Sequence, residues 1–109
     1  MGNQLLDAML KYQREDGRFH DFMDEPDTFI DGTSAMMMSV YIYRGILEGW
    51  LARSYLAYAE KAYTSVCASM DEFGILHEVC GCPNFVSQGT SCEAQASFIM
   101  ASAWREKVL

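Results

Sequence analysis

Positive charge is scarce in this chain. Eight Lys and Arg residues stand against fifteen Asp and Glu residues, which gives a formal net charge of −7 at pH 7. The few cations form no cluster, so nucleic acid is not an expected partner. The first residues also lack the basic flank and the apolar run of a secretory signal peptide. We therefore expect a cytoplasmic protein.

Long unbroken apolar runs are also absent. The most apolar stretch, residues 35–51, is interrupted by Arg44, Gly45, Glu48 and Gly49. Such a stretch predicts a buried helix and no membrane span. Because 50% of the 109 residues are apolar, the chain can bury a core, and its length fits one small domain.

Paired cysteines at the spacing of a zinc ribbon or a redox motif are missing as well. Cys80 and Cys82 form a C-x-C, while Cys67 and Cys92 stand alone. His77 precedes Cys80 by three residues, so a metal site is conceivable, but no second ligand pair accompanies it. We expect four reduced thiols that pack as small apolar groups, with no metal and no cofactor.

The chain does contain one sequence pattern that occurs twice. Residues 15–34 and 72–91 share seven identical positions at a constant offset of 57, with no gap. This predicts an internal structural repeat. The identical residues of the first copy are Glu15, Gly17, His20, Pro26, Gly32, Thr33 and Ser34.

Each copy predicts a helix, a long loop and a second helix. Apolar spacing predicts these helices at about residues 3–14, 34–51, 53–70 and 91–107. Each loop has about 16 residues, and loops of that length carry function or short strands of their own. The second helix is apolar on nearly every face, which predicts burial between neighbours.

We therefore expect an all-α fold made of two tandem αα-hairpins in a single domain, residues 1–109. The first repeat would cover about residues 1–52 and the second about residues 53–109. Only one or two residues near position 52 would join the repeats. Stacked hairpins of this kind form a solenoid or a closed toroid, with both long loops on one rim.

The Gly-Thr-Ser triplets at residues 32–34 and 89–91 are predicted to stand where helices begin. Ser and Thr are favoured N-caps, and residues 90–93 match a capping box. A helix N-terminus with a nearby glycine also attracts anions, so a sugar carboxylate could bind there. Both interpretations stay open, and the candidate binding residues are Thr33, Ser34, Gly89, Thr90 and Ser91.

Two more pairs of repeat partners are candidates. Asp31 and Gln88 each precede a Gly-Thr-Ser triplet, and both side chains can hydrogen-bond a polyol. His20 and His77 each follow a glycine by three positions and precede an acid. Each histidine either contacts the substrate or is held by a nearby carboxylate or carbonyl.

Four segments carry a resemblance to a known family. Residues 29–36, Phe-Ile-Asp-Gly-Thr-Ser-Ala-Met, resemble a helix start of glycoside hydrolase family 88 and its sister family 105. These are the unsaturated glucuronyl and rhamnogalacturonyl hydrolases. Residues 41–49 look like the Tyr- and Gly-containing helix of that family. Residues 79–83 and 88–98 look like its C-terminal segment.

This resemblance implies an (α/α)₆ toroid of six hairpins, of which the chain would supply the last third. It also implies hydration of the C4=C5 double bond of a terminal unsaturated uronic acid, in oligosaccharides from pectin or glycosaminoglycans. In that family a carboxylic acid protonates the alkene and activates water. The matching Asp lies upstream of the segments found here, so the catalytic residues of this chain stay unknown. Residues 31–34 and 88–91 would form a wall of the substrate pocket.

Two classes of function therefore stay open. The chain is either a partial glycosidase domain, inactive alone, or a non-catalytic helical-repeat module that binds carbohydrate or protein. An incomplete toroid leaves apolar flanks exposed, which predicts a homo-oligomer or association with the missing N-terminal hairpins.

Overall fold

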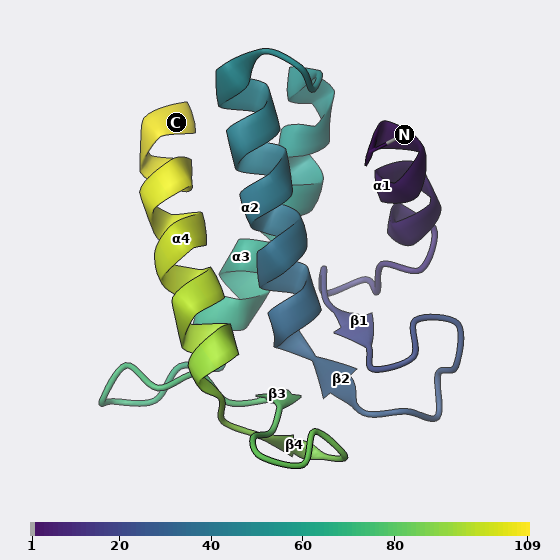
Figure 1. Cartoon of the computed structure of the whole chain (residues 1–109), viewed down its shortest axis with the longest axis vertical. Helices are drawn as coiled ribbons and strands as arrows, with labels where there is room; N and C mark the ends of the chain where they lie inside the picture. Colours follow the sequence, from purple (N-terminus) through teal and green to yellow (C-terminus); the bar gives the residue numbers. More distant parts are fainter. Residues whose placement is uncertain (1) are drawn as a thin grey trace.

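The computed structural model describes residues 2–109 and is mainly helical, which confirms the all-α class (Figure 1). Short antiparallel pairs of strands interrupt both long loops. The elements in chain order are α1 Gly2–Leu10, β1 Phe19–His20, β2 Ile30–Asp31, α2 Gly32–Glu48, a 3₁₀ turn Arg53–Tyr55, α3 Leu56–Cys67, β3 Val79–Cys80, β4 Gln88–Gly89 and α4 Cys92–Val108.

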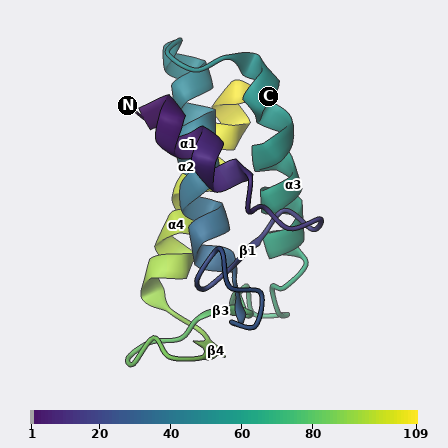
Figure 2. The ribbon, with the colours of Figure 1, turned by 90° about the vertical axis from the view of Figure 1, so that its right-hand side faces the viewer.

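Helix α2 is the centre of the array. It packs against both α3 and α4, while α1 lies on its remaining flank (Figure 1). The chain runs in the same direction along α2 and α4 and in the opposite direction along α3. Both strand pairs consequently lie toward one end of the helices, as the turned view also shows (Figure 2). We call residues 11–31 the first rim loop and residues 68–91 the second rim loop.

The core joins the helices to both rim loops. Alanines at the helix contacts allow close approach, and Ala35, Ala59 and Ala101 are fully buried. The largest fully buried side chains come from α2, α3 and both loops, and each contributes about 1.5–3 kcal/mol by leaving water. They are Tyr43, Phe19, Met36, Ile42, Leu76, Val66 and Val79.

Of the two long helices, α4 is capped by a serine of its Gly-Thr-Ser triplet, as predicted, whereas α2 begins at a different cap. Asp31 is the N-cap of α2, and its carboxylate accepts the Thr33 N–H. The first Gly-Thr-Ser triplet is therefore the first turn of the helix, where we had expected it to supply the cap. Ser91 caps α4 by accepting the Ala94 N–H. The capping box predicted over residues 90–93 is wrong, because the helix begins one residue later than that box requires.

Other helices are shorter than predicted, because the backbone groups beyond their ends form hydrogen bonds within the rim loops. Helix α1 ends at Leu10, four residues before the predicted end. Helix α3 ends at Cys67, because Met70 pairs with Leu76 of the second rim loop. Its predicted first turn is a 3₁₀ segment, and four residues, 49–52, separate that segment from α2. The longer connection accommodates Gly49, whose φ of 87° ends α2 in a left-handed turn.

Candidate functional site

The two rim loops meet at Asp31. Its Oδ1 atom accepts the Thr33 N–H at 2.9 Å and the Cys80 N–H at 2.8 Å. The Gly32 N–H donates to the Glu78 carbonyl at 3.0 Å. One carboxylate thus holds the first turn of α2 and fastens strand β3 of the second loop beside it. Asp31, expected to contact a polyol, is placed at the junction of the two loops.

Gln88 contributes a second link between the loops. Its Nε2 donates to the Ile30 carbonyl at 2.8 Å. Gly89 pairs with Val79, and a Cβ on Gly89 would lie 3.2 Å from the Cα of Gly81. Glycine at these two positions lets the β3–β4 hairpin close tightly. The candidates Gln88 and Gly89 are therefore built into the surface where the loops meet.

An ion pair adds a third link, on the outside of the junction. The Arg18 guanidinium donates to Glu78 at 3.1 Å and to Asp16 at 2.9 Å. Burial raises the pKa of the Asp16 carboxyl, but hydrogen bonds from the backbone and side chain of Arg18 outweigh it and lower the pKa below its ordinary value. The first loop thus presents a fixed cation to the second.

The two Gly-Thr-Ser triplets occupy different environments. Thr33 is buried, and among residues 2–109 its Oγ1 has no hydrogen-bond partner. Ser34 Oγ donates back to the Asp31 carbonyl at 3.1 Å. Thr90 is exposed and its carbonyl accepts the Cys82 N–H at 3.0 Å. The same three residue types therefore form the first turn of α2 in one copy, and in the other they immediately precede α4.

The candidate residues also line separate cavities. Ser34 opens on an apolar groove of about 370 Å³ between α1 and α2. Thr90 and Ser91 line a pocket of about 300 Å³. That pocket is completed by Ile75, Cys82, Cys92 and Gln95. The structure brings Thr90 and Ser91 together, and it does not join them to Ser34 in one cavity.

Both loop histidines are held by neighbouring groups. His20 Nδ1 lies 2.8 Å from the Thr28 carbonyl, and its Nε2 lies 3.0 Å from the Arg14 guanidinium. A neutral ring that donates from Nδ1 and accepts at Nε2 fits both contacts. His77 Nε2 lies 2.8 Å from Asp71. These are the carbonyl and carboxylate contacts that one of the two alternatives expects.

Exposed aromatic rings on the rim are features that the sequence interpretation missed. Phe22, Phe73 and Phe85 lie in the two rim loops and are 59%, 80% and 46% exposed. Sugar rings stack on such faces because their C–H groups are apolar. Their position in the sequence could have identified them, because these three rings lie outside every helix while most other aromatic residues follow helical spacing.

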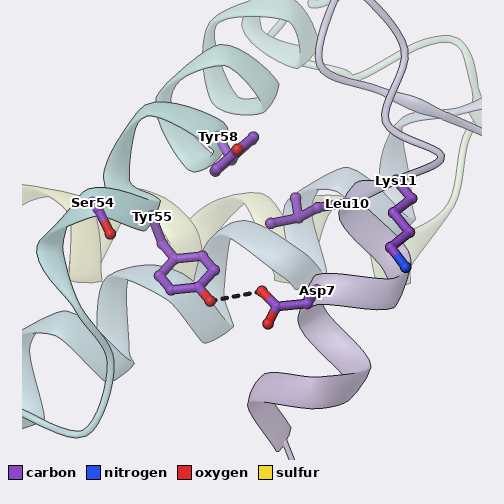
Figure 3. A pocket seen from close by; sticks show the side chains of 6 residues that line it. All are labelled: Asp7, Leu10, Lys11, Ser54, Tyr55 and Tyr58. Atoms are coloured by element: carbon purple, nitrogen blue, oxygen red, sulfur yellow. Dashed lines mark hydrogen bonds between the residues drawn. The ribbon is translucent and has the colours of Figure 1, made fainter.

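A second polar pocket lies at the other end of the helices, between α1 and the start of α3 (Figure 3). Its volume is about 390 Å³. Tyr55 and Asp7 point toward each other, and the Tyr55 hydroxyl donates to Asp7 Oδ1 at 2.6 Å. This hydrogen bond raises the pKa of Tyr55. Three separate elements form the pocket, so no local motif marks it.

Glu60 is the most enclosed hydrogen-bonded acid of the helical core. Arg105 donates to both of its oxygens, at 2.8 and 2.9 Å, and the Tyr43 hydroxyl donates at 2.5 Å. The Arg105 hydrogen bond is the main cause of the lowered pKa of Glu60, against the effect of burial. An acid that stays ionised at neutral pH is a poor proton donor to an alkene. The network joins α2, α3 and α4, and we assign it to the fold.

All four cysteines are free thiols. Within residues 2–109, no group of three or more His, Cys, Asp or Glu side chains is arranged to hold a metal ion. The helices of the same residues include none long and apolar enough to cross a membrane.

Comparison with known proteins places this geometry in a family. The model of Glycosyl Hydrolase Family 88 matches residues 1–104. A glycosyl hydrolase family 88 protein from Bacteroides vulgatus has a TM-score of 0.84 at 16% identity, over 98% of this chain and 34% of its own. A possible member of glycoside hydrolase family 105 from Klebsiella pneumoniae has a TM-score of 0.81 at 17% identity, over 94% of this chain and 30% of its own.

A family 105 glycoside hydrolase from C. acetobutylicum is also similar, with a TM-score of 0.76 at 18% identity. The match covers 96% of this chain and 36% of that one. No curated protein matches at a significant level. The chain thus spans about a third of the length of these solved structures, and at these identities the likeness establishes the fold.

Proposed function

This chain belongs to glycosyl hydrolase family 88, and we propose that its rim supplies one wall of the pocket for an unsaturated uronide. The reaction would be hydration of the C4=C5 double bond of the terminal sugar. A proton adds to C4 and the hydroxyl of water adds to C5, giving a hemiketal that opens and releases the next sugar. The linkage would be one found in pectin or glycosaminoglycan fragments.

The observation that carries this proposal is the fastening of the second rim loop to the first at Asp31. Both loops emerge at one end of the helices and are joined by hydrogen bonds. Their exposed groups would therefore be positioned for a shared ligand before it binds. Thr90, Phe22 and Phe85 are exposed residues of the two rim loops. Hydroxyl and aromatic groups of this kind match the hydroxyls and the apolar face of a sugar ring.

Within this proposal Asp31 is a positioning residue and not the catalytic acid. Its carboxylate already accepts two backbone N–H groups, which hold it at the junction of the two loops. Glu60 is held ionised by Arg105. The proton donor for the alkene would therefore come from another part of the complete enzyme, and the isolated chain would be inactive.

Two measurements test the proposal. Titration of ¹⁵N-labelled chain with an unsaturated disaccharide should shift the amide signals of residues 88–91 and of the residues around Phe22. Shifts confined to the Tyr55 pocket would move the sugar site to the other end of the helices. The near-ultraviolet absorbance of the alkene should persist with the chain alone, and its loss would show that a catalytic acid is present here.

A second candidate function is a non-catalytic module that binds through its helical faces. The specific observation in its favour is the exposure of apolar side chains on α4, where Ile99 is 66% and Met100 is 51% exposed. Either candidate requires a partner for this surface, which is a further set of hairpins or another copy of the chain.

A further inference from the structure

The pocket between α1 and the start of α3, which we call the Tyr55 pocket, is shaped by contacts between these two segments. The Tyr55 hydroxyl donates to Asp7 Oδ1 at 2.6 Å. Gln13 Nε2, three residues beyond α1, donates to the Tyr58 carbonyl at 3.2 Å. The rings of Tyr55 and Tyr58 lie with their centres 6.4 Å apart and their planes tilted by 47°. The walls of the pocket are therefore in position before a ligand binds.

Several polar groups of the Tyr55 pocket are available to a ligand. Within residues 2–109, the second carboxylate oxygen of Asp7, the Lys11 ammonium and the Ser54 hydroxyl form no hydrogen bond or ion pair. Asp7 and Lys11 are only four positions apart, yet they are not paired with each other. In Figure 3 Tyr55 lies on one side of the pocket and Lys11 on the other, with Leu10 between them. Opposite charges and a hydroxyl thus surround an apolar centre.

Tyr58 adds an aromatic face to this pocket. Its side chain is 43% exposed, so the ring is accessible to a ligand, and Leu10 beside it is partly buried. An aromatic ring and an aliphatic side chain match the C–H groups of a pyranose ring, while the surrounding polar groups match its hydroxyls. The volume of about 390 Å³ lies within the range of about 300–1,000 Å³ that is usual for small-molecule sites.

We propose that the Tyr55 pocket binds a neutral pyranoside. A sugar hydroxyl both donates and accepts, so hydroxyls of one ring can donate to Asp7 and accept from Lys11. An anion would be attracted by Lys11 and repelled by Asp7, and a cation would meet the reverse. The net charge of −7 further disfavours an anion. A zwitterionic amino acid would pair with both ions but leave the Ser54 hydroxyl unused.

This site is separate from the rim. It lies at the other end of the helices, and none of its residues is among the candidates at residues 31–34 and 88–91. The inference therefore does not depend on the proposed wall for an unsaturated uronide. It gives the chain a second sugar contact, which recognises an uncharged ring.

Titration of ¹⁵N-labelled chain with the methyl glycosides of glucose, galactose and mannose tests the proposal. At least one of these neutral sugars should shift the amide signals of residues 7–11 and 54–58. Methyl glucuronide carries the same ring with a carboxylate, and it should bind about fivefold more weakly because of the charge on Asp7. Phenylalanine serves as the zwitterionic probe and should also bind more weakly than the neutral sugar.

Two pairs of variants assign the contacts. Asp7→Ala removes the charged acceptor and should weaken binding about tenfold, whereas Glu106→Ala, at an exposed position of α4 outside the pocket, should leave it unchanged. Tyr58→Ala removes the aromatic face and should weaken binding about fivefold. Tyr58→Phe keeps the ring and should retain the wild-type affinity. Circular dichroism confirms that each variant is folded.

The titrations also define the results that would overturn the proposal. One is the absence of shifts at residues 7–11 and 54–58 with all three neutral glycosides. Another is tighter binding of methyl glucuronide or of phenylalanine than of any neutral glycoside. Unchanged affinity in either Asp7→Ala or Tyr58→Ala would equally show that the sugar does not bind in the Tyr55 pocket.

Discussion

The two rim loops start with the same turn and are anchored in different ways. Gly17 and Gly74 are repeat partners, both have positive φ, at 93° and 81°, and each donates its N–H to the residue three positions earlier. A Cβ on Gly17 would lie 2.7 Å from backbone atoms of Lys61 and Ala62, whereas a Cβ on Gly74 would meet nothing within 4 Å. The shared sequence specifies the backbone conformation, while the surroundings of each copy decide its burial.

The second loop obtains its anchor from a side chain. Gln95 of α4 accepts the Leu76 N–H at 2.7 Å and donates to the Gly74 carbonyl at 3.1 Å. In the first loop Gln13 donates to the carbonyls of Gly17 and Tyr58. The first loop therefore packs its backbone directly on α3, and the second depends on Gln95 and on its links to the first loop.

The largest difference in stability between the two loops is expected when their glycines are replaced. Gly74→Ala places a side chain in a left-handed turn and should cost about 1 kcal/mol in the free energy of unfolding. Gly17→Ala has that cost and also forces the first loop away from α3, so we expect a loss of about 3 kcal/mol or more. Urea unfolding of both variants measures the two costs. Equal losses would show that the first loop does not rest on α3 as described.

The next difference concerns the two helix caps. Ser91→Ala removes one cap hydrogen bond from α4 and should cost about 1 kcal/mol. Asp31→Ala removes the cap of α2 together with the link to Cys80, so about 2 kcal/mol is expected. Asp31→Asn keeps one oxygen acceptor and should fall between the two in urea unfolding. A smaller loss for Asp31→Ala than for Ser91→Ala would mean that Asp31 acts on one loop only.

A smaller contrast is expected from the two anchoring glutamines. Gln95→Ala removes both hydrogen bonds that join α4 to the turn at Gly74, which should cost about 1–2 kcal/mol. Gln13→Ala should cost less than about 1 kcal/mol, because Gly17 still packs on α3 without it. Thermal unfolding followed by circular dichroism compares the pair. The reverse order would indicate that the second loop is held mainly by its strands.

The smallest effect is the pH dependence that Asp71 contributes. Asp71 accepts hydrogen bonds from His77 and from the N–H groups of Phe73 and Ile75, and the His77 bond is the main cause that lowers the pKa of Asp71. A lowered pKa adds stability above the ordinary value of 3.8, and that stability is lost as the pH falls through the pKa of the folded state.

Asp71→Asn removes this titration from the second loop. The free energy of unfolding, measured between about pH 5 and about pH 3, should therefore fall less steeply in the variant than in the wild type. The repeat partner of Asp71 in the first loop is Arg14, so this titration has no counterpart at the equivalent position of that loop. An unchanged slope would contradict the contacts assigned to Asp71.

The sequence predicted the features that depend only on residues adjacent in the chain. The offset of 57 correctly indicated two equivalent turns, because a glycine stop depends on the local backbone. The caps were harder to assign. Asp31 and Ser91 are both good N-cap residues, but local preference does not decide which residue of Asp-Gly-Thr-Ser or Gln-Gly-Thr-Ser begins the helix.

The links between the loops could not be found in the sequence. Asp31 and Cys80 lie 49 positions apart, and Gln88 and Ile30 lie 58 apart. Their contacts depend on how α2 and α4 pack, which brings the two loops to the same end. The expected pairing of Asp31 with Gln88 as sugar contacts rested on repeat position, and repeat position carries no information on which polar groups the fold itself uses.

The account depends most on the claim that one carboxylate joins both rim loops into a single surface. Native-state hydrogen exchange of the Cys80 amide tests it directly. The Cys80 N–H should exchange slowly in the wild type and rapidly in Asp31→Ala, while the N–H of Ile42 in the middle of α2 stays protected in both. Rapid exchange of Cys80 in the wild type, or protection that survives in Asp31→Ala, would show that the loops are not joined at Asp31.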